Sequence, residues 1–519
     1  MKPGKPLLLH WCLILLLPLA ACRTKAPMAG TTDDGLIAVQ LLQINDVYEI
    51  GPLEGGKVGG MSRVAGFRKQ LLAQNPNTLT VHAGDFLSPS LLGALRYQGS
   101  RIKGRQMVEA MNEAGVDLVT FGNHEFDLDE NELQDRLNQS KFRWVSSNVH
   151  HQCGDYHFPF YSERPDGYHP VEDTWVWDTR DADGTRLRVG FFGLTLPSNP
   201  KDFVRYEDYT AAARRAVNSL KDQCDCIVGL THLELEQDIA LAPSLSEVTL
   251  FAGGHDHTWS LDSVGTTKIA KADANAKTAW VHTLHFDRNT KRCRVAFQLK
   301  TMDNSVPQVA ALDSIVARWD GILDATIREV VAEPYEVIFN ATEPLDGREK
   351  SIRNEATNLG GLIARAFRWS AGPEVELAVF NSGGIRIDDE ISGDVTAIDI
   401  FRVLPFGGSL WRVTMKGELL QQLLNTGLQN KGNGGFLQMD GVSLGNSGSW
   451  LINGQALDIN RNYRLVTNDF LLSGKETNLG YLTETNPGIV SINKPTDAPD
   501  DVLKDMRRAI VAYLRSGRR

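Results

Sequence analysis

The segment Asp117–Asp127 reads DLVTFGNHEFD and joins a short apolar run to a group of polar side chains. The run Asp117–Phe121 contains β-branched and aromatic residues and stops at a glycine, which is typical of a buried strand. After Gly122 come an amide, an imidazole and two carboxylates. Because ligands collect at the carboxyl ends of strands in open α/β sheets, this segment predicts a sheet with a functional site at one edge.

The same pattern recurs along the first half of the chain. Further apolar runs, bounded by glycine or polar residues, are predicted strands at 37–44, 78–82, 143–147, 187–194, 226–230 and 248–252. Helical patterns lie between several of these runs, for example at 105–114 and 130–137. Alternating strands and helices predict an α/β body with a buried sheet.

A second body is predicted after this one. A helical pattern at about 308–331 could join the two bodies. From Tyr335 the alternation starts again, with predicted helices at 358–369 and 417–428, a strand at 375–380 and a glycine-rich loop at 430–440.

Five of the predicted strands in the first half lead into side chains that can bind metal ions. In chain order these are Asp46, Asp85, Asn123, His124, His232, His255 and His257. Carboxylates and imidazoles suit zinc or manganese, and iron in some sites. Two ions about 4 Å apart can hold a phosphoryl group and activate water between them. We expect Asp85 to be shared by both ions, and His124, oriented by Asp127, to stabilise charge on the reacting group.

This order of motifs resembles the calcineurin-like metallophosphoesterases. The motifs are Asp46, Gly84-Asp85, Gly122-Asn123-His124-Glu125, His232 and Gly254-His255-Asp256-His257. The resemblance implies one metal ion bound by Asp46, Asp85 and His257. It implies a second ion bound by Asp85, Asn123, His232 and His255. It also implies that His124 and Asp127 form the catalytic pair.

Three glycine-rich motifs in the second half point to substrate binding. They are Asn381-Ser-Gly-Gly-Ile-Arg386, Leu404-Pro-Phe-Gly-Gly408 and Asn468-Asp-Phe-Leu-Leu-Ser-Gly474. Phe406 and Phe470 could stack on the two faces of a nucleotide base, although core packing is the alternative role for phenylalanine. Arg386, or Arg353 upstream, could bind phosphate or ribose oxygens through its guanidinium group.

These motifs resemble the C-terminal domain of the 5′-nucleotidase family, which includes bacterial UDP-sugar hydrolases, and the resemblance covers about residues 36–500. It implies a metallophosphoesterase part built as a four-layer β-sandwich flanked by helices. A linker helix would join this part to a smaller α+β substrate-binding domain, which in this family swings to bring the substrate to the metals. Phe406 and Phe470 would stack the base. The implied substrate contacts are Arg353, Asn381 and Arg386.

Two positions depart from the family pattern. The family reads Asp-x-His where this chain has Asp46-Val-Tyr48. Tyr48 could bind a metal as a phenolate, or point elsewhere while water completes the coordination, or mark a site that only binds nucleotides. The family's last motif ends in an aspartate for the ribose hydroxyls, and Glu476 could replace it here with one extra methylene.

The N-terminus resembles a bacterial lipoprotein signal. Charged Lys2 and Lys5 precede the apolar stretch Leu7–Leu19, and Ala20-Ala21 precede Cys22. Cys22 is the expected lipidation site, although an ordinary signal peptide is the alternative. Arg23 carries no inner-membrane retention signal, which favours an outer-membrane anchor. Four cysteines then remain as candidates for disulfides in an oxidising compartment, namely Cys153, Cys224, Cys226 and Cys293.

The predicted organisation has five parts: a signal peptide (1–22), a tether (23–35), a catalytic domain (36–305), a linker helix (306–334) and a substrate-binding domain (335–519). The 519 residues carry a net charge of −10 and no run of lysine or arginine, which argues against nucleic acid as a partner. No sequence feature predicts a protein partner. The only expected membrane contact is the lipid at Cys22.

The sequence therefore predicts an exported, lipid-anchored phosphohydrolase in the periplasm or on the cell surface. It would use two divalent ions (zinc, manganese or iron) to release phosphate from 5′-nucleotides, and UDP-sugars form a second candidate substrate class. Alternatives are hydrolysis of 2′,3′-cyclic nucleotides or another ester, and a surface lipoprotein that binds nucleotides without turnover.

Overall fold

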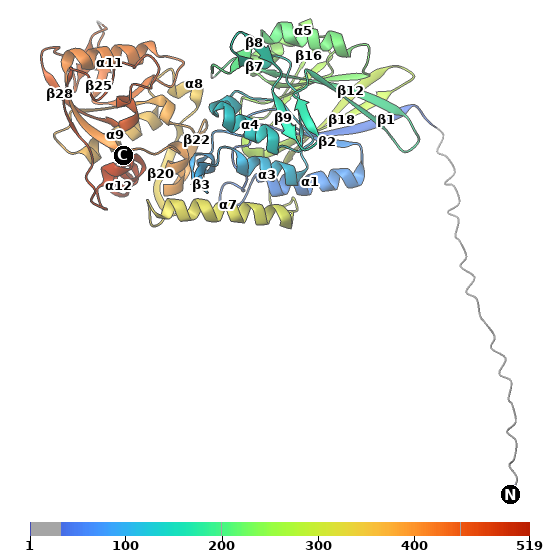
Figure 1. Ribbon diagram of the computed structural model, residues 1–519, viewed down its shortest axis with the longest axis horizontal. Coiled ribbons are helices and arrows are strands. Elements are labelled where there is room, and N and C mark those ends of the chain that lie inside the picture. The colour runs from blue at the N-terminus through green and yellow to red at the C-terminus, as the bar shows by residue number, and fades with distance from the viewer. Residues whose placement is uncertain (2–32, 199, 447, 519) are drawn as a thin grey trace.

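The structure is a computed structural model that describes residues 1, 33–198, 200–446 and 448–518. The signal peptide, Cys22 and most of the expected tether lie outside the described residues. Two bodies follow one another along the chain, and Figure 1 shows them side by side, with the long helix α7 running beneath the first.

The first body contains two six-stranded sheets. One has the order β19-β18-β1-β2-β5-β6, in which β1, β2, β5 and β6 are parallel. Its strands are β1 (Leu36–Ile44), β2 (Thr78–His82), β5 (Leu118–Val119), β6 (Arg143–Trp144), β18 (Thr278–Asp287) and β19 (Arg292–Thr301). The other has the order β11-β12-β14-β15-β17-β16. Its strands are β11 (Thr174–Arg180), β12 (Arg186–Thr195), β14 (Cys226–His232), β15 (Leu250–Gly253), β16 (Ser260–Val264) and β17 (Thr267–Lys271).

The two sheets pack face to face, and helices cover their outer faces. Val39 and Val81 of the first sheet share a buried cluster with Val189 and Val228 of the second. Helices α1 (Met61–Gln74), α3 (Arg105–Ala114) and α4 (Glu130–Gln139) cover the first sheet, and α5 (Tyr209–Leu220) and α6 (Leu235–Leu241) cover the second. Figure 1 shows α5 on the opposite side of the body from α1 and α3. The four-layer sandwich is confirmed.

Several smaller elements of this body left no clear sequence pattern. They are α2 (Leu91–Ala94), β3 (Arg96–Tyr97), β4 (Ser100–Arg101), β7 (Val149–Cys153), β8 (Tyr156–Phe158), β9 (Tyr161–Arg164), β10 (Gly167–Pro170) and β13 (Val204–Tyr206). The strands among these elements form two- and three-stranded sheets at the surface. Short exposed strands carry no alternation of buried and exposed residues, so periodicity cannot find them.

A disulfide joins the two sheets of the sandwich. Cys226 in β14 bonds to Cys293 in β19, with Cα atoms 6.2 Å apart. Among the described cysteines, Cys153 and Cys224 form no disulfide. One of the pairings that the sequence left open is thereby identified.

Helix α7 (Ala310–Arg328) occupies the segment where the sequence predicts a joining helix. Its buried residues recur every three or four positions, namely Leu312, Val316, Trp319, Leu323 and Ile327. This stripe packs on α1 and α3, so the helix is fixed to the first body along its length. None of the helices in the described residues combines the length and apolarity needed to cross a bilayer.

The second body is an α+β domain around a five-stranded sheet of order β24-β21-β28-β23-β29. These strands are β21 (Leu377–Asn381), β23 (Leu410–Lys416), β24 (Leu437–Asp440), β28 (Asn462–Asn468) and β29 (Ile489–Asn493). Helices α9 (Asn358–Ala371) and α12 (Met506–Arg515) pack on one face and α11 (Gly417–Gln429) on the other. The remaining elements are β20 (Val337–Asp346), α8 (Glu349–Ile352), β22 (Glu390–Thr396), α10 (Ala397–Val403), β25 (Val442–Leu444), β26 (Trp450–Ile452) and β27 (Gln455–Ala456).

The loop predicted at 430–440 is wrong at its C-terminal end, because Leu437–Asp440 form strand β24. This strand pairs antiparallel with β21, and Leu437 enters the core beneath α11. The amide of Gln438 also donates to the carbonyl groups of Ile352 and Glu355. These partners are distant in sequence, so a four-residue strand beside a glycine-rich turn is recognised only after folding.

Candidate active site

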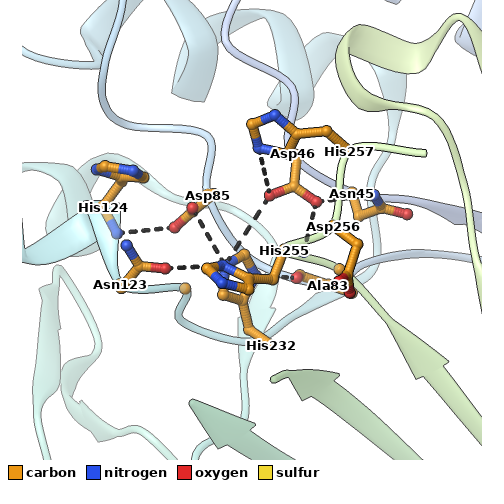
Figure 2. A network of polar contacts seen from close by, with 12 residues as sticks. Asn45, Asp46, Ala83, Asp85, Asn123, His124, His232, His255, Asp256 and His257 are labelled. Carbon is orange, nitrogen blue, oxygen red and sulfur yellow. Dashed lines mark hydrogen bonds and ion pairs between the residues drawn. The ribbon is translucent and has the colours of Figure 1, made fainter. Parts of the chain in front are cut away.

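The side chains predicted to bind metal gather where strands of both sheets end. Asp46 follows β1, Asp85 follows β2 and Asn123 follows β5, while His232 ends β14 and His255 and His257 follow β15. Figure 2 shows Asp46, Asp85, Asn123, His232, His255 and His257 turned toward one another. Ligand atoms of Asp85, His232 and His255 lie within 4.8 Å of one another. The sequence-predicted set is therefore brought together in space.

Tight backbone turns bring these strand ends close together. Asp46, Asp85, His255 and His257 all have positive φ angles, between 53° and 84°. Such angles are uncommon outside glycine and cluster at functional sites. At Gly122 even one methyl group would clash, because a Cβ atom would lie 2.1 Å from Oδ1 of Asp85. The glycines beside the acidic residues thus allow close approach of the two loops.

Backbone carbonyl groups fix the tautomers of two histidines. Nδ1 of His232 lies 2.7 Å from the Ala83 carbonyl, and Nδ1 of His257 lies 2.8 Å from the Asp388 carbonyl. A carbonyl only accepts, so each Nδ1 carries a proton, and a ring that binds a metal ion would direct its Nε2 lone pair into the cluster. Nε2 of His232 lies 3.1 Å from Oδ2 of Asp85 and 3.2 Å from Oδ1 of Asn123.

The cluster concentrates negative charge away from water. Asp46 and Asp85 are almost fully buried. Burial would raise the pKa of each carboxyl group, but the charge of His232 outweighs it, so both pKa values lie below their usual range. Burial would also lower the pKa of His232, yet the charges of Asp85 and Asp46 raise it to about 9. These carboxylates therefore favour a cation at the centre of the cluster.

The chemistry of this donor set fits divalent or trivalent metal ions. Buried carboxylate oxygens, an amide oxygen and imidazole nitrogens converge there, and such ligands suit zinc, manganese and iron. Tyr48 also points into the cluster, with its phenol oxygen 2.9 Å from Nε2 of His257. Burial, and then the charges of Asp85 and Asp46, raise the pKa of Tyr48 well above its usual value.

His124 and Asp127 form the predicted pair. Nδ1 of His124 lies 2.9 Å from Oδ2 of Asp127, which also accepts from the Ser88 hydroxyl at 2.9 Å. Burial would lower the pKa of His124, but the charges of Asp127 and then Asp85 raise it to about 10. A protonated imidazole held in this way can stabilise negative charge on a reacting group.

Sequence reasoning gave no role to two buried charged residues that support the cluster. Glu125 accepts backbone N–H groups of Asp85, Phe86, Leu87 and Gly122, and it thereby fixes the loop that carries Asp85. Burial, and then the charge of Asp85, raise its pKa to about 7. Its place inside the Gly-Asn-His-Glu motif is the sequence feature that could have indicated this supporting role.

Lys271 is the second of these residues. Its ammonium group donates to the Gly254 carbonyl at 2.8 Å, pairs with Asp256 and lies 3.3 Å from Asp238. It thus fixes the backbone beside His255 and His257. Lys271 ends an ordinary strand and gives no local signal.

The predicted substrate-binding side chains fall into two groups. Arg386 pairs with Asp127 across the two bodies, and Arg353 pairs with Glu349 at 2.6 Å. Cavities of about 180 and 420 Å³ lie beside these arginines, and the larger one also borders Asn123, His124 and His257. Arg353 and Arg386 are therefore within reach of the metal cluster.

Asn381, Phe470 and Glu476 line neither cavity. Instead, Asn381 donates to Glu476 at 2.6 Å and accepts from Asn468 at 3.0 Å. Phe406 borders the smaller cavity and is 55% exposed, while Phe470 is 43% exposed. Core packing does not explain exposed rings of this size.

Comparisons with known proteins agree with this architecture. Residues 337–482 match the family described as 5′-nucleotidase, C-terminal domain. A structure of a 5′-nucleotidase precursor from Thermus thermophilus shares the fold, with a TM-score of 0.66 and 23% identity over 93% of this chain and 97% of that one. The chain therefore shares the fold of this Thermus protein over nearly its whole length.

Proteins with similar sequences point to the same family. A trifunctional nucleotide phosphoesterase of Bacillus subtilis is 27% identical over 81% of this chain. Human 5′-nucleotidase is 26% identical over 74% of this chain. The chain spans 31% of the bacterial relative and 69% of the human one. The resemblance to the 5′-nucleotidase family is thus confirmed.

Proposed function

We propose that this protein is a metal-dependent phosphohydrolase that releases phosphate from 5′-nucleotides, with UDP-sugars as a second substrate class. The observation that carries the proposal is the convergence of carboxylate, amide and imidazole ligands at strand ends. Two arginines of the second body lie beside them, because Arg353 lines a cavity with Asn123 and His257, and Arg386 pairs with Asp127. The names of the relatives, which are nucleotide phosphoesterases and 5′-nucleotidases, support the same substrate class.

The proposed metal sites use the residues predicted from sequence. Asp46, Asp85 and His257 would hold one ion, and Asp85, Asn123, His232 and His255 the other. Bound ions would supply positive charge for the phosphoryl oxygens and lower the pKa of a water molecule. His124 would stabilise charge on the transferred group or the leaving oxygen, and Asp127 keeps its imidazole oriented.

The second body would select the nucleotide. Phe406 and Phe470 would stack the base, and Arg353 and Arg386 would bind phosphate or ribose oxygens. Asn381 and Glu476, which bond to each other, would contact the sugar. We propose residues 36–305, 306–334 and 335–519 as catalytic domain, linker and substrate-binding domain.

Export would place this activity in nucleotide salvage outside the inner membrane. Residues 1–22 would direct export, and residues 23–35 would tether the enzyme to a lipid on Cys22 in the outer membrane. The relatives include a cell wall protein of Listeria monocytogenes and a snake venom 5′-nucleotidase, which is consistent with an extracytoplasmic location.

Phosphate release from AMP tests the proposal. Purified full-length protein would be stripped of metal, reloaded with manganese, zinc or iron and assayed beside Asp85→Asn. Metal-dependent release that the variant lacks is the expected result. Folded protein without turnover on AMP, but active on 2′,3′-cyclic AMP, would favour the cyclic-nucleotide alternative. Tight AMP binding without turnover on any ester would favour a nucleotide-binding lipoprotein.

A further inference from the structure

We propose that Tyr48 is a direct ligand of the metal ion held by Asp46 and His257, and that its oxygen makes this site selective for a trivalent ion, ferric iron. This inference rests on the metal site of the proposed function. It concerns the position where the chain departs from the Asp-x-His pattern.

The phenol oxygen of Tyr48 lies inside the ligand cluster. It is 2.9 Å from Nε2 of His257, 3.3 Å from Oδ2 of Asp85 and 3.4 Å from Oδ1 of Asp46. Nε2 of His257 lies 3.5 Å from Oδ1 of Asp46. Metal–ligand bonds of about 2.0–2.1 Å place neighbouring ligand atoms about 3.0 Å apart in an octahedron and about 3.3 Å apart in a tetrahedron. These four separations lie near the values expected for ligands of one ion and place the Tyr48 oxygen beside all three other ligands.

The polar atoms around the Tyr48 oxygen are mostly acceptors. The two carboxylates can only accept, and a neutral His257 that donates Nδ1–H to the Asp388 carbonyl presents a lone pair at Nε2. The Tyr48 hydroxyl has one proton, so it can serve one of these three neighbours. Oδ2 of Asp388 adds a further acceptor 3.6 Å from Nε2 of His257. A positive charge among these acceptors, either a proton on His257 or a metal ion, stabilises their close packing.

The backbone holds Tyr48 in this orientation. The side-chain oxygen of Asn275 accepts from the N–H groups of Tyr48 and Glu49, at 2.9 and 3.1 Å. The N–H of Asn275 in turn donates to the Asp46 carbonyl. The tyrosine is only 6% exposed. Its oxygen is therefore positioned before any metal binds, as expected of a ligand.

The charge of the ligand set favours a trivalent ion. On binding, the metal replaces the phenol proton, which leaves to solvent. Asp46, Asp85 and the Tyr48 phenolate then bring three negative charges to one ion, although Asp85 would be shared with the second site. Hard oxygen anions match a small, highly charged cation better than zinc, which also accepts nitrogen and sulfur ligands.

Optical spectroscopy of the iron-loaded full-length protein tests this inference without relying on turnover. A phenolate bound to ferric iron gives a visible charge-transfer band, and we expect this band in the wild type and its loss in Tyr48→Phe. Removal of groups that only hydrogen-bond to metal ligands already lowers metal affinity about 10–100-fold, so loss of a direct ligand should lower iron affinity about 100-fold or more. Iron bound without the band, failure to retain iron while zinc binds, or a band that persists in Tyr48→Phe would overturn the proposal.

Tyr206→Phe is the matched control. The Tyr206 hydroxyl donates to the Ser198 carbonyl at 2.6 Å. Burial, and then the charges of Asp85 and Glu125, raise the pKa of Tyr206. Asp85 and Glu125 act on both tyrosines, but the Tyr206 hydroxyl bonds to a backbone carbonyl and not to the metal-ligand cluster, so Tyr206→Phe should keep the band. Loss of the band in this control alone would move the assignment to Tyr206.

Phosphate release from AMP, measured in the same preparations, separates the two proposals. If the iron-loaded wild type hydrolyses AMP but lacks the band, the proposed function is supported and Tyr48 is not a metal ligand. If the band depends on Tyr48 but the protein does not hydrolyse AMP, Tyr48 is a ligand and the proposed function is contradicted. Resonance Raman spectra excited in the band should show tyrosinate modes, which a change in folding would not produce.

Discussion

The metal-ligand cluster and the proposed nucleotide-binding face, which consists of Arg353, Arg386, Phe406 and Phe470, differ in what holds their side chains in place. In the cluster, backbone carbonyl and N–H groups orient His232, His257 and Glu125, and the side chains of His232 and Glu125 are fully buried. On the nucleotide-binding face, Arg386 and Arg353 are held by acidic residues, and Phe406 is exposed. The first region is organised before its ligand arrives, whereas the second must exchange ion pairs for substrate contacts.

This difference bears on two free-energy terms, the reorganisation of the site in the transition state and the binding of substrate. A preorganised cluster needs little rearrangement when charge develops in the transition state. Arginines paired with acids must lose those partners before they bind phosphate, and this lowers the net affinity. We therefore expect substitutions in the cluster to act on kcat and metal content, and substitutions on the nucleotide-binding face to act on KM.

Asp85→Asn should cause the largest loss. Asp85 would serve both ions, and removal of one electrostatic stabiliser typically costs about 10²–10³ in kcat. We expect kcat/KM for AMP to fall by about 10³-fold or more, together with the metal content measured by mass spectrometry. A variant with two metals per chain and a normal kcat would contradict this prediction, because metal binding and catalysis would then not depend on the shared carboxylate.

Metal removal should destabilise the two bodies unequally. Ligand at about 1,000 times Kd stabilises the folded state by about 4 kcal/mol, and only the first body contains the cluster. Chelation should therefore speed amide hydrogen exchange in β1, β2 and β14 much more than in β21 and β28. Equal acceleration in both bodies would mean that the cluster and the nucleotide-binding face are one cooperative unit.

Arg386→Met should raise KM with little change in metal content. Hydrogen bonds to charged groups contribute about 1.5–3 kcal/mol, which corresponds to about 10–150-fold in affinity. Because Arg386 also pairs with Asp127, a smaller fall in kcat should accompany the rise in KM. Arg365→Met, which changes an exposed arginine of α9, is the control and should match the wild type.

The sequence predicted the cluster better than the nucleotide-binding face, and the reason is physical. Metal ligands of this type follow strands, so apolar runs that end in Asp, Asn or His mark both the sheet and its functional edge. The α/β body and the convergence of His232 with Asp85 could be inferred in this way, whereas the four-layer sandwich was implied by the family resemblance. Lys271 could not, because its role depends on carbonyl groups brought together only by folding.

The pairing of Arg386 with Asp127 shows the limit of the same reasoning. These residues are 259 positions apart and belong to different bodies. A sequence motif can mark an arginine as a phosphate ligand, but it cannot show which carboxylate holds that arginine. Strand β24 escaped prediction for a related reason, since its partner β21 and the acceptors of Gln438 are remote in sequence.

Phe406→Ala should weaken substrates that carry a base and spare those that do not. Stacking of a base on an aromatic ring contributes about 1–3 kcal/mol, so KM for AMP should rise about 5–150-fold. KM for ribose 5-phosphate should stay unchanged, as should the metal content. Phe158→Ala provides a matched control, because Phe158 is equally exposed (55%) but lies on β8 of the first body. An equal effect on both substrates would argue against base stacking and for a general role in cleft shape.

Glu349→Gln should have the smallest effect, and in the opposite direction. Glu349 pairs with Arg353 at 2.6 Å, and its other carboxylate oxygen lies 3.9 Å from Nε2 of His124. Glu349 therefore places negative charge beside the Arg353 guanidinium and the His124 imidazole, which would both face the substrate phosphate. Exposed ion pairs contribute about 0.2–1 kcal/mol, and this more shielded pair should lie at the upper end of that range, so its loss should lower KM for AMP about 5-fold. A rise in KM would mean that Glu349 positions Arg353 for the substrate, and the arginines of the second body would then be as preorganised as the metal cluster.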